Sequence, residues 1–270
     1  MLSGGGAKTA AHLGAHRALR EAGFEAACYV ATSMGAVVAA GLASGVTADE
    51  LLEIMAQAGP RGVVRDPVAA VAGWFGRSLL KPAPLRRAIE ALVPARRFAD
   101  LSVPLTVTTV DLDTGELVLF GAGAQTAPLI DVLCASCALP LYYPPVPLNG
   151  RRLGDGGLRG VIPLEPAARM PLELVLAVDV GPGFDLKDSS DPARLPPLLR
   201  AHDAAVGILM ATNSADQLAL WRSDPSRPPL VYVRPRVERN ATFRVDRVRE
   251  YAAEGRRAAR DALERWGRDS

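Results

Sequence analysis

The sequence predicts an α/β fold with a largely parallel central sheet. Apolar segments of strand length alternate along the chain with segments of helical character, which is the pattern of this class. The chain has 270 residues. That length is enough for one large domain over 1–270, which would bury about three quarters of the surface of the unfolded chain. Hydrophobic residues make up 49% of the sequence and aromatic residues only 5%, so we expect a core of Ala, Val and Leu.

The first half of the chain carries signals for where its helices begin and end. Gly23 and Gly45 are placed as the glycines that follow a helix, and Thr47 with Glu50 forms a capping box at the start of another. These signals and the apolar spacing predict helices over 10–23, 34–45, 48–57, 84–93 and 127–136. Strands are predicted over 26–31, 103–110 and 116–120.

The second half begins with a hairpin and ends with a long helix. Asn149-Gly150 is the strongest short-range signal for a tight type I′ turn, so we expect the segments on either side of it, within 146–153, to pair. Further strands are predicted over 172–180 and 230–235, and helices around 197–222 and 244–266. The last helix has arginines on its polar side, which indicates either a terminal helix docked on the sheet or a helix on a membrane surface.

An irregular segment, 59–82, carries large apolar residues beside glycines. Trp74, Phe75, Leu79 and Leu80 in this segment are either part of the buried core or an interfacial patch or lid. The sequence leaves both alternatives open.

The composition excludes several classes of function. A net charge of +2, without a basic face interleaved with aromatic residues, excludes a nucleic-acid partner. The three cysteines do not make a disulfide framework, and Cys134 with Cys137 lacks the second pair that zinc would need, so we expect no metal and no cofactor. No apolar run approaches about 20 residues and no signal peptide is evident, so we expect a cytoplasmic protein. The oligomeric state is left open.

The chain opens on a glycine-rich loop, “SGGGAKT”, ahead of the first helix. A nucleotide-binding P-loop requires glycines where this chain has Leu2 and Ala7. Glycine amides are unobstructed at a helix N-terminus, where the helix dipole also favours negative charge. We therefore expect the loop to hold the oxyanion of a reaction intermediate, through Gly4, Gly5 and Gly6.

A second segment, “YVATSMGAVVAA”, places Ser33 between a strand and a helix. This is the layout of the nucleophile elbow, G-x-S-x-G, with Ala31 at the position of the first glycine and Gly35 at the second. The elbow needs small residues because its neighbours are pressed against the adjoining strand and helix. The alternative is an ordinary helix start in which Thr32 or Ser33 caps the helix.

A nucleophilic serine needs a base, and Asp155 in “RRLGDGGLRG” is the candidate. Its flanking glycines also fit a simple turn residue. An aspartate of ordinary pKa, about 3.9, is a weak base, so a Ser33–Asp155 dyad requires a desolvated carboxyl or a short hydrogen bond. The order Ser33, Asp155, His202 also allows a triad, but a nucleophile at position 33 leaves no room for the strands that precede it in α/β-hydrolases. His12 and His16 are expected in the core or on the surface.

Together and in this order, “GGGAKT”, “ATSMG” and “DGG” resemble the motifs of the patatin-like phospholipases, especially the short bacterial members. That family has a Gly-Gly-Gly-x-Arg/Lys-Gly loop, a G-x-S-x-G elbow and an Asp-Gly-Gly/Ala motif. The blocks between the motifs are similar as well, including “ASCALPLYYPPV” before the aspartate and “GLRGVIPLEPA” after it. The resemblance therefore covers most of the chain.

The resemblance implies a three-layer α/β/α sandwich with a mostly parallel central sheet. It implies a serine acyl-ester hydrolase of the phospholipase A or lysophospholipase type, acting through an acyl-serine intermediate. Ser33 would be the nucleophile, Asp155 the base, and Gly4, Gly5 and Gly6 the oxyanion hole. The partner would be a lipid or acyl-ester substrate, with peripheral membrane contact allowed.

Three features depart from the family pattern. Thr9 replaces the last glycine of the loop, Ala31 replaces the first glycine of the elbow, and the chain begins at Met1-Leu2 where the family has a full strand. They motivate an alternative from another class, a catalytically silent lipid-binding or regulatory protein on the same fold.

Overall fold

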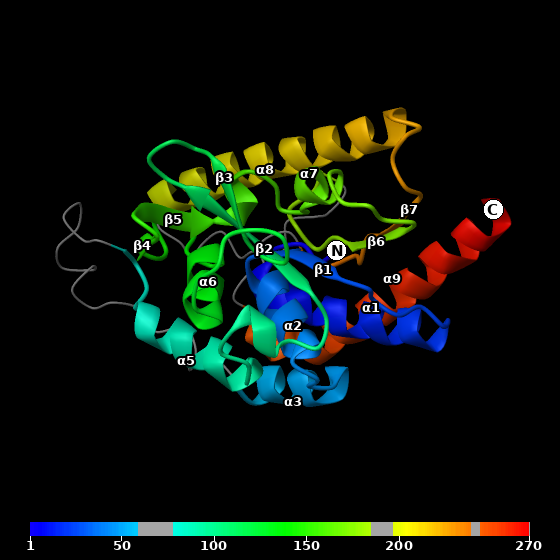
Figure 1. The fold of residues 1–270 in the computed structure, drawn as a ribbon, viewed down its shortest axis with the longest axis horizontal. Helices are drawn as coiled ribbons and strands as arrows, with labels where there is room; N and C mark the ends of the chain where they lie inside the picture. The colour runs from blue at the N-terminus through cyan, green and yellow to red at the C-terminus, as the bar shows by residue number, and fades with distance from the viewer. Residues whose placement is uncertain (59–77, 185–196, 239–243, 270) are drawn as a thin grey trace.

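The protein has a mixed α/β fold (Figure 1). The computed structural model describes residues 1–58, 78–184, 197–238 and 244–269. One sheet has the strand order β1-β2-β5-β4, with β3 also paired to β2, and a second pairs β6 with β7. The strands are β1 (Tyr29–Thr32), β2 (Leu105–Asp111), β3 (Leu117–Gly121), β4 (Val146–Leu148), β5 (Arg151–Asp155), β6 (Val175–Val178) and β7 (Leu230–Val233).

The first residues of the chain join the two sheets. Leu2 forms parallel bridges to Ala31 on one side and to Val178 on the other. Its amide donates to the Val30 carbonyl at 3.1 Å, and its carbonyl accepts from the Thr32 amide at 3.2 Å. Residues 1–3 thus occupy the position of a strand between β1 and β6, although the sequence analysis expected none there.

The sheet is mixed, so the prediction of a mostly parallel sheet was wrong. β1 pairs with β2 and β6 with β7 in parallel, whereas β2–β3, β2–β5 and β4–β5 are antiparallel. Short turns produce two of the antiparallel pairs, because only neighbouring antiparallel strands can be joined by a tight turn. The predicted hairpin at Asn149-Gly150 is confirmed: both residues have positive φ, 51° and 75°.

The register of the strands brings the last residues of β1 and β5 together. Thr32, the last residue of β1, pairs with Thr108 of β2, and Asp155, the last residue of β5, pairs with the next residue, Thr109. β5 therefore continues along β2 where β1 stops. The residue that follows β1 and the residue that ends β5 consequently meet at one point.

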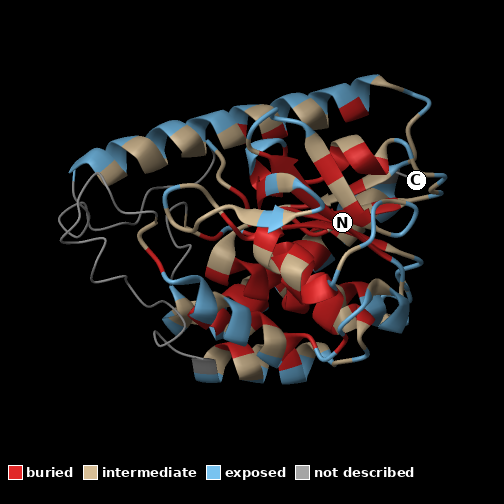
Figure 2. Cartoon of the chain, turned by 60° about the vertical axis from the view of Figure 1, so that its left-hand side comes forward, coloured by how far each residue is buried: buried red, intermediate tan, exposed pale blue. Residues whose placement is uncertain are grey.

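Helices cover both faces of this sheet (Figures 1 and 2). On one side lie α1, α2, α3, α5, α6 and α9, and on the other α7 and α8. Their bounds are α1 (Ala10–Glu21), α2 (Met34–Ala43), α3 (Ala48–Ala58), α5 (Pro82–Leu92), α6 (Leu129–Ser136), α7 (Leu164–Ala167), α8 (Pro197–Ser223) and α9 (Val248–Asp269). Among the described residues of α8, only Ala211, Ser214 and Trp221 are buried.

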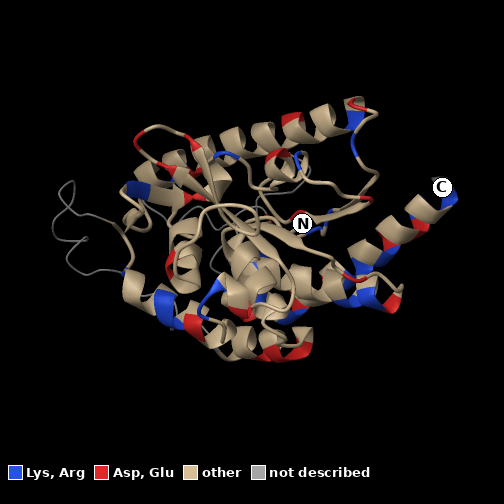
Figure 3. Ribbon diagram, in the orientation of Figure 1, with Lys and Arg blue, Asp and Glu red and all other residues tan. Residues whose placement is uncertain are grey.

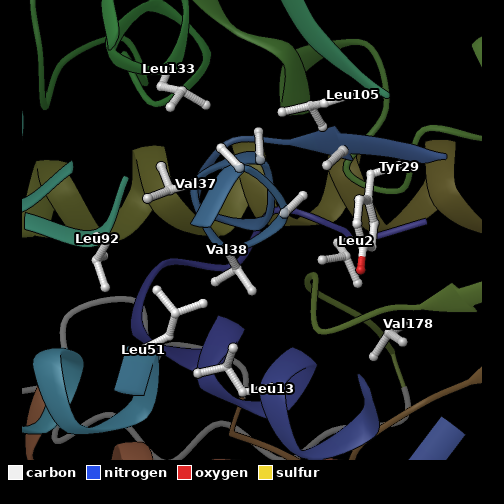
Figure 4. Close-up of a cluster of buried hydrophobic side chains, with 14 of the residues drawn as sticks. Leu2, Leu13, Tyr29, Val37, Val38, Leu51, Leu92, Leu105, Leu133 and Val178 are labelled. Carbon is white, nitrogen blue, oxygen red and sulfur yellow. The ribbon is translucent and has the colours of Figure 1, made fainter. Parts of the chain in front are cut away.

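The core is built mainly from Ala, Val and Leu, as the composition predicts. Leu13, Val38 and Leu51 from three helices lie close together in this core, on the same side of β1 as Leu2 (Figure 4). Small residues also set the contact between α1 and α9. A Cβ at Gly14 would lie 1.7 Å from the Ala252 carbonyl oxygen, and one at Gly255 would lie 1.9 Å from that of Ala11.

Charged residues line α9 and the helices beside it (Figure 3), and three arginines of α9 pair with acidic residues of α1 and α3. Arg249 contacts Glu53 of α3 at 2.7 Å, while Arg256 and Arg260 contact Glu21 of α1 at 2.6 and 2.9 Å. These ion pairs support the interpretation of α9 as a docked terminal helix.

Two further expectations concern apolar segments. Trp74 and Phe75 lie outside the described residues, while Leu80 is buried, with 5% of its surface exposed. Within the part of the chain that the structure describes, no helix is both long and apolar enough to span a bilayer.

Candidate active site

Ser33 lies on a sharp turn between β1 and α2. Its backbone has φ 54° and ψ −134°, a conformation that is uncommon for a residue with a side chain and that costs about 1–3 kcal/mol. The turn requires glycine two residues later, because a Cβ at Gly35 would lie 2.2 Å from the Ser3 carbonyl oxygen. Ala31, at the other small position, is fully buried in the core. The fold therefore accommodates the extra methyl group at position 31.

The turn presents the Ser33 hydroxyl to Asp155. Ser33 Oγ donates to Asp155 Oδ2 at 2.7 Å, and Asp155 Oδ1 accepts from the Gly157 amide at 2.8 Å. The Asp155 amide in turn donates to the Ala138 carbonyl at 3.0 Å. Serine and carboxylate are thus in direct contact. Hydrogen bonds to both carboxylate oxygens and from the backbone amide of Asp155 hold the aspartate in place.

The environment of Asp155 changes its acidity. Only 6% of its surface is exposed, and this burial raises the pKa of the Asp155 carboxyl to about 6, because the charged form is desolvated. The hydrogen bonds from Gly157 and Ser33 act in the opposite direction. The carboxyl is therefore a stronger base than an ordinary aspartate, as the sequence analysis required of a dyad.

The glycine loop lies beside the serine. A Cβ at Gly4 would be 3.2 Å from Ser33 Cβ, so a side chain there would crowd the Ser33 side chain. The Gly4 amide donates to the Val161 carbonyl at 3.0 Å and is therefore already engaged. No acceptor for the amides of Gly5 and Gly6 is found among the described residues, and Gly6 has φ 60°. Within the loop, these two amides are the ones available to a bound anion.

A buried polar cluster anchors this loop. The His12 side chain is completely buried, and its Nε2 donates to the Ser3 carbonyl at 2.8 Å. The Ser3 hydroxyl accepts from the Val180 amide at 2.8 Å. Thr9, which stands where the family has glycine, donates from its hydroxyl to the Gly6 carbonyl at 2.6 Å. Lys8 is buried as well.

One residue next to the serine was missed by the sequence analysis. The Ser136 hydroxyl accepts from the Ser33 amide at 2.8 Å and donates to the Thr108 carbonyl at 2.8 Å. From the sequence, this residue was expected only as the end of the helix over 127–136, and no role at the site was predicted for it. The available signal was its place in “ASCALPLYYPPV”, the block that resembles the family's segment before the aspartate.

The other candidate groups lie outside this arrangement. His202 hydrogen-bonds to Asp203 at 3.2 Å, whereas the contacts of Asp155 are with Ser33 and Gly157, so the structure does not assemble the alternative triad. Burial raises the pKa of Cys134 to about 11 and that of Cys137 well above its usual range. Both therefore stay thiols at neutral pH. Across the described ranges, no cluster of His, Cys, Asp and Glu suits a metal ion.

The fold and this site define a class: an α/β protein in which a serine on a strand-to-helix turn contacts an aspartate directly. The protein-family model for patatin-like phospholipases matches residues 1–168, which include the glycine loop, Ser33 and Asp155. The chain therefore belongs to the patatin-like phospholipase family, and the resemblance found in the sequence is confirmed.

Individual relatives agree with this assignment. An uncharacterized NTE family protein of Mycobacterium tuberculosis is 30% identical over 223 residues, covering 80% of this chain and 59% of the relative. Patatin-like phospholipase domain-containing protein 6 of Mus musculus is 28% identical over 184 residues, 67% of this chain and 13% of that protein. The chain thus spans about three fifths of the first of these and a small part of the second.

A solved structure resembles the whole fold. VipD from Legionella pneumophila aligns with 97% of this chain and 66% of its own, with a TM-score of 0.50 and 15% sequence identity. At this identity the similarity concerns the fold alone, and it agrees with a mixed α/β architecture.

Proposed function

We propose that this chain is a serine acyl-ester hydrolase of the phospholipase A or lysophospholipase type. The observation that carries the proposal is the 2.7 Å hydrogen bond from Ser33 Oγ to Asp155 Oδ2, made by a serine held at φ 54°. A raised carboxyl pKa supports the role of Asp155 as base. Family membership supports lipid acyl esters as the substrate class.

In the acylation step, Ser33 Oγ attacks the ester carbonyl carbon while its proton passes to Asp155 Oδ2. The tetrahedral intermediate carries a negative oxygen, which the amides of Gly5 and Gly6 stabilise, together with the Met34 amide at the start of α2. One such donor contributes about 10²–10³ in rate. Gly4, whose amide is engaged by Val161, contributes by lacking a side chain.

Collapse of the intermediate breaks the ester C–O bond. The leaving alcohol takes the proton from Asp155, and the acyl group remains on Ser33 as an ester. In the second half, Asp155 removes a proton from water, which attacks the acyl-enzyme carbonyl. The second intermediate collapses with return of that proton to Ser33 Oγ, and a fatty acid leaves.

The wider expectations belong to the same proposal. Residues 1–270 would act as a single patatin-like acyl hydrolase domain on a three-layer α/β/α scaffold, without a cofactor or a metal. The enzyme would act on lipid or acyl esters in the cytoplasm, with peripheral contact to a membrane.

The test is labelling with a fluorophosphonate probe, followed by mass spectrometry to locate the adduct, and turnover of a lysophospholipid. We expect an adduct on Ser33, and loss of both labelling and turnover in Ser33→Ala. Ser44→Ala is the matched control, since Ser44 bonds to Ala40 at the other end of α2 and should leave both unchanged. Liposome binding by folded wild-type protein without label or turnover would instead favour the silent lipid-binding alternative.

A further inference from the structure

We propose that Ser136 is a positioning residue that holds the Ser33 turn in register with Asp155. The proposal rests on the proposed function, since it concerns how that nucleophile is kept in place. Ser136 ends α6 and is fully buried, and its hydroxyl is the acceptor for the Ser33 backbone amide. It is not placed to touch the substrate's reacting atoms, so its effect is exerted through Ser33.

The direction of both hydrogen bonds is fixed by chemistry. The Thr108 oxygen is a carbonyl and can only accept, so the single hydroxyl proton of Ser136 points toward it. The lone pairs of the same hydroxyl are then left for the Ser33 amide, which can only donate. The hydroxyl therefore forms a defined bridge between the two backbone groups, with 2.8 Å on each side.

The hydrogen-bonded bridge ends on β2, at the place where β2 also pairs with Asp155. Thr108 pairs with Thr32, and its neighbour Thr109 pairs with Asp155. Adjacent residues of β2 thus position the backbone of Asp155 through strand pairing and the Ser33 amide through Ser136. Both partners of the Ser33–Asp155 contact are therefore anchored to this one segment of β2.

Ser33 requires such support because its backbone is strained. A residue with positive φ keeps that conformation only when its surroundings determine it. Without the Ser136 hydroxyl, the Ser33 amide would lose its acceptor, and the turn would relax toward one that satisfies the amide elsewhere. Relaxation would lengthen the contact between Ser33 Oγ and Asp155 Oδ2. A displacement of about 1 Å in a reacting group can reduce a rate by about 10²-fold.

The test measures chemistry separately from stability in the full-length enzyme. In Ser136→Ala we expect the rate constant for fluorophosphonate labelling and kcat to fall by roughly 10- to 100-fold, with KM changed by less than about twofold. Ser102→Ala is the matched control, because Ser102 also donates from its hydroxyl to a backbone carbonyl, that of Ala43 at 2.7 Å, away from the site. It should keep wild-type rates.

The pH dependence of kcat/KM distinguishes this role from a general loss of stability, which would leave that pH dependence unchanged. The hydrogen bond from Ser33 lowers the pKa of Asp155, so weakening it in Ser136→Ala should shift the acidic limb of kcat/KM to higher pH. Should the Ala variant fail to fold, Ser136→Thr and Ser136→Val decide the question. They have the same shape, and only Thr keeps the hydroxyl, so Thr should be at least about 10 times faster than Val.

Two results would overturn the inference. The first is that Ser136→Ala keeps the wild-type labelling rate and pH dependence, or that Ser136→Thr and Ser136→Val have equal rates, while Ser33→Ala is inactive. The proposed function would then stand, and the role of Ser136 would not. The other is full activity of Ser33→Ala, which would remove the proposed function and this inference together.

Discussion

The Ser33 hydroxyl donates directly to the Asp155 carboxylate over 2.7 Å, with no group between them. In a triad, a histidine of near-neutral pKa takes the serine proton. In the dyad that we propose, the carboxyl would act as the base alone, and it is suited to this because burial raises the pKa of Asp155 to about 6. The contact and the burial are therefore complementary parts of the same site.

The first prediction concerns the pH dependence of hydrolysis. Asp155 accepts a proton only when ionised, so kcat/KM should rise as the pH increases through about 6 and level off above it. Asp155→Asn keeps the shape of the side chain but not the base, and should lower kcat by about 10²–10⁴ and lack this limb. The measurement is kcat/KM for a soluble ester between pH 4.5 and 8. An acidic limb near the ordinary aspartate value of about 3.9 would contradict the proposed desolvation.

The second prediction concerns stability in acid. Burial lowers the pKa of His12 to about 4 from 6.5, so the folded protein keeps this histidine neutral where the unfolded chain binds a proton. The unfolded state then gains protons as the pH falls from about 6.5 to about 4, and the free energy of unfolding decreases over this range. The shift corresponds to about 3 kcal/mol of stability present at pH 7 and lost by pH 4.

The control for this prediction is His12→Gln, whose amide can donate to the Ser3 carbonyl but does not titrate. Asp155 has the opposite effect in the same range, because a raised carboxyl pKa makes stability fall as the pH rises from about 4 to about 6. The informative quantity is therefore the difference in unfolding free energy between wild type and His12→Gln, measured by urea denaturation at pH 7 and pH 4.5. If that difference does not change with pH, the pKa of His12 is not lowered in the folded protein.

Local signals in the sequence predicted the local features of this fold. The capping box was predicted from Thr47 and Glu50, and the structure has both of its hydrogen bonds, at 2.9 and 3.2 Å. The tight turn was likewise predicted from Asn149-Gly150 alone. Such features depend on residues within a few positions of one another, so their physics is contained in the sequence segment itself.

Strand order and the supporting contacts of the site could not be predicted in this way. That β5 continues along β2 antiparallel to it depends on pairing between residues far apart in the chain, such as Thr109 and Asp155. The engagement of the Gly4 amide by Val161 is equally non-local. The motifs identify Ser33, Asp155 and the glycines in the sequence. The contacts between segments far apart in the chain then determine which backbone amides remain available to an anion.

The third prediction tests the close contact between α1 and α9. Gly14 and Gly255 let the two helices approach until a Cβ would lie 1.7 or 1.9 Å from the facing carbonyl oxygen, which is backbone and cannot turn aside. Alanine normally favours a helix over glycine by up to about 1 kcal/mol. At these two positions the helices must instead separate, so Gly14→Ala or Gly255→Ala should lower the free energy of unfolding by about 1–3 kcal/mol or more.

Gly267→Ala is the matched control within α9, because nothing lies within 4 Å of a Cβ at that position. It should leave stability unchanged or raise it by less than about 1 kcal/mol. Urea denaturation of the three variants and wild type measures these values directly. Since α1 also carries His12 and follows the glycine loop, separation of the helices should reduce fluorophosphonate labelling of Ser33 in the folded Gly14 and Gly255 variants as well. Stability at or above the wild-type value in either variant would mean that the contact is looser than the structure describes.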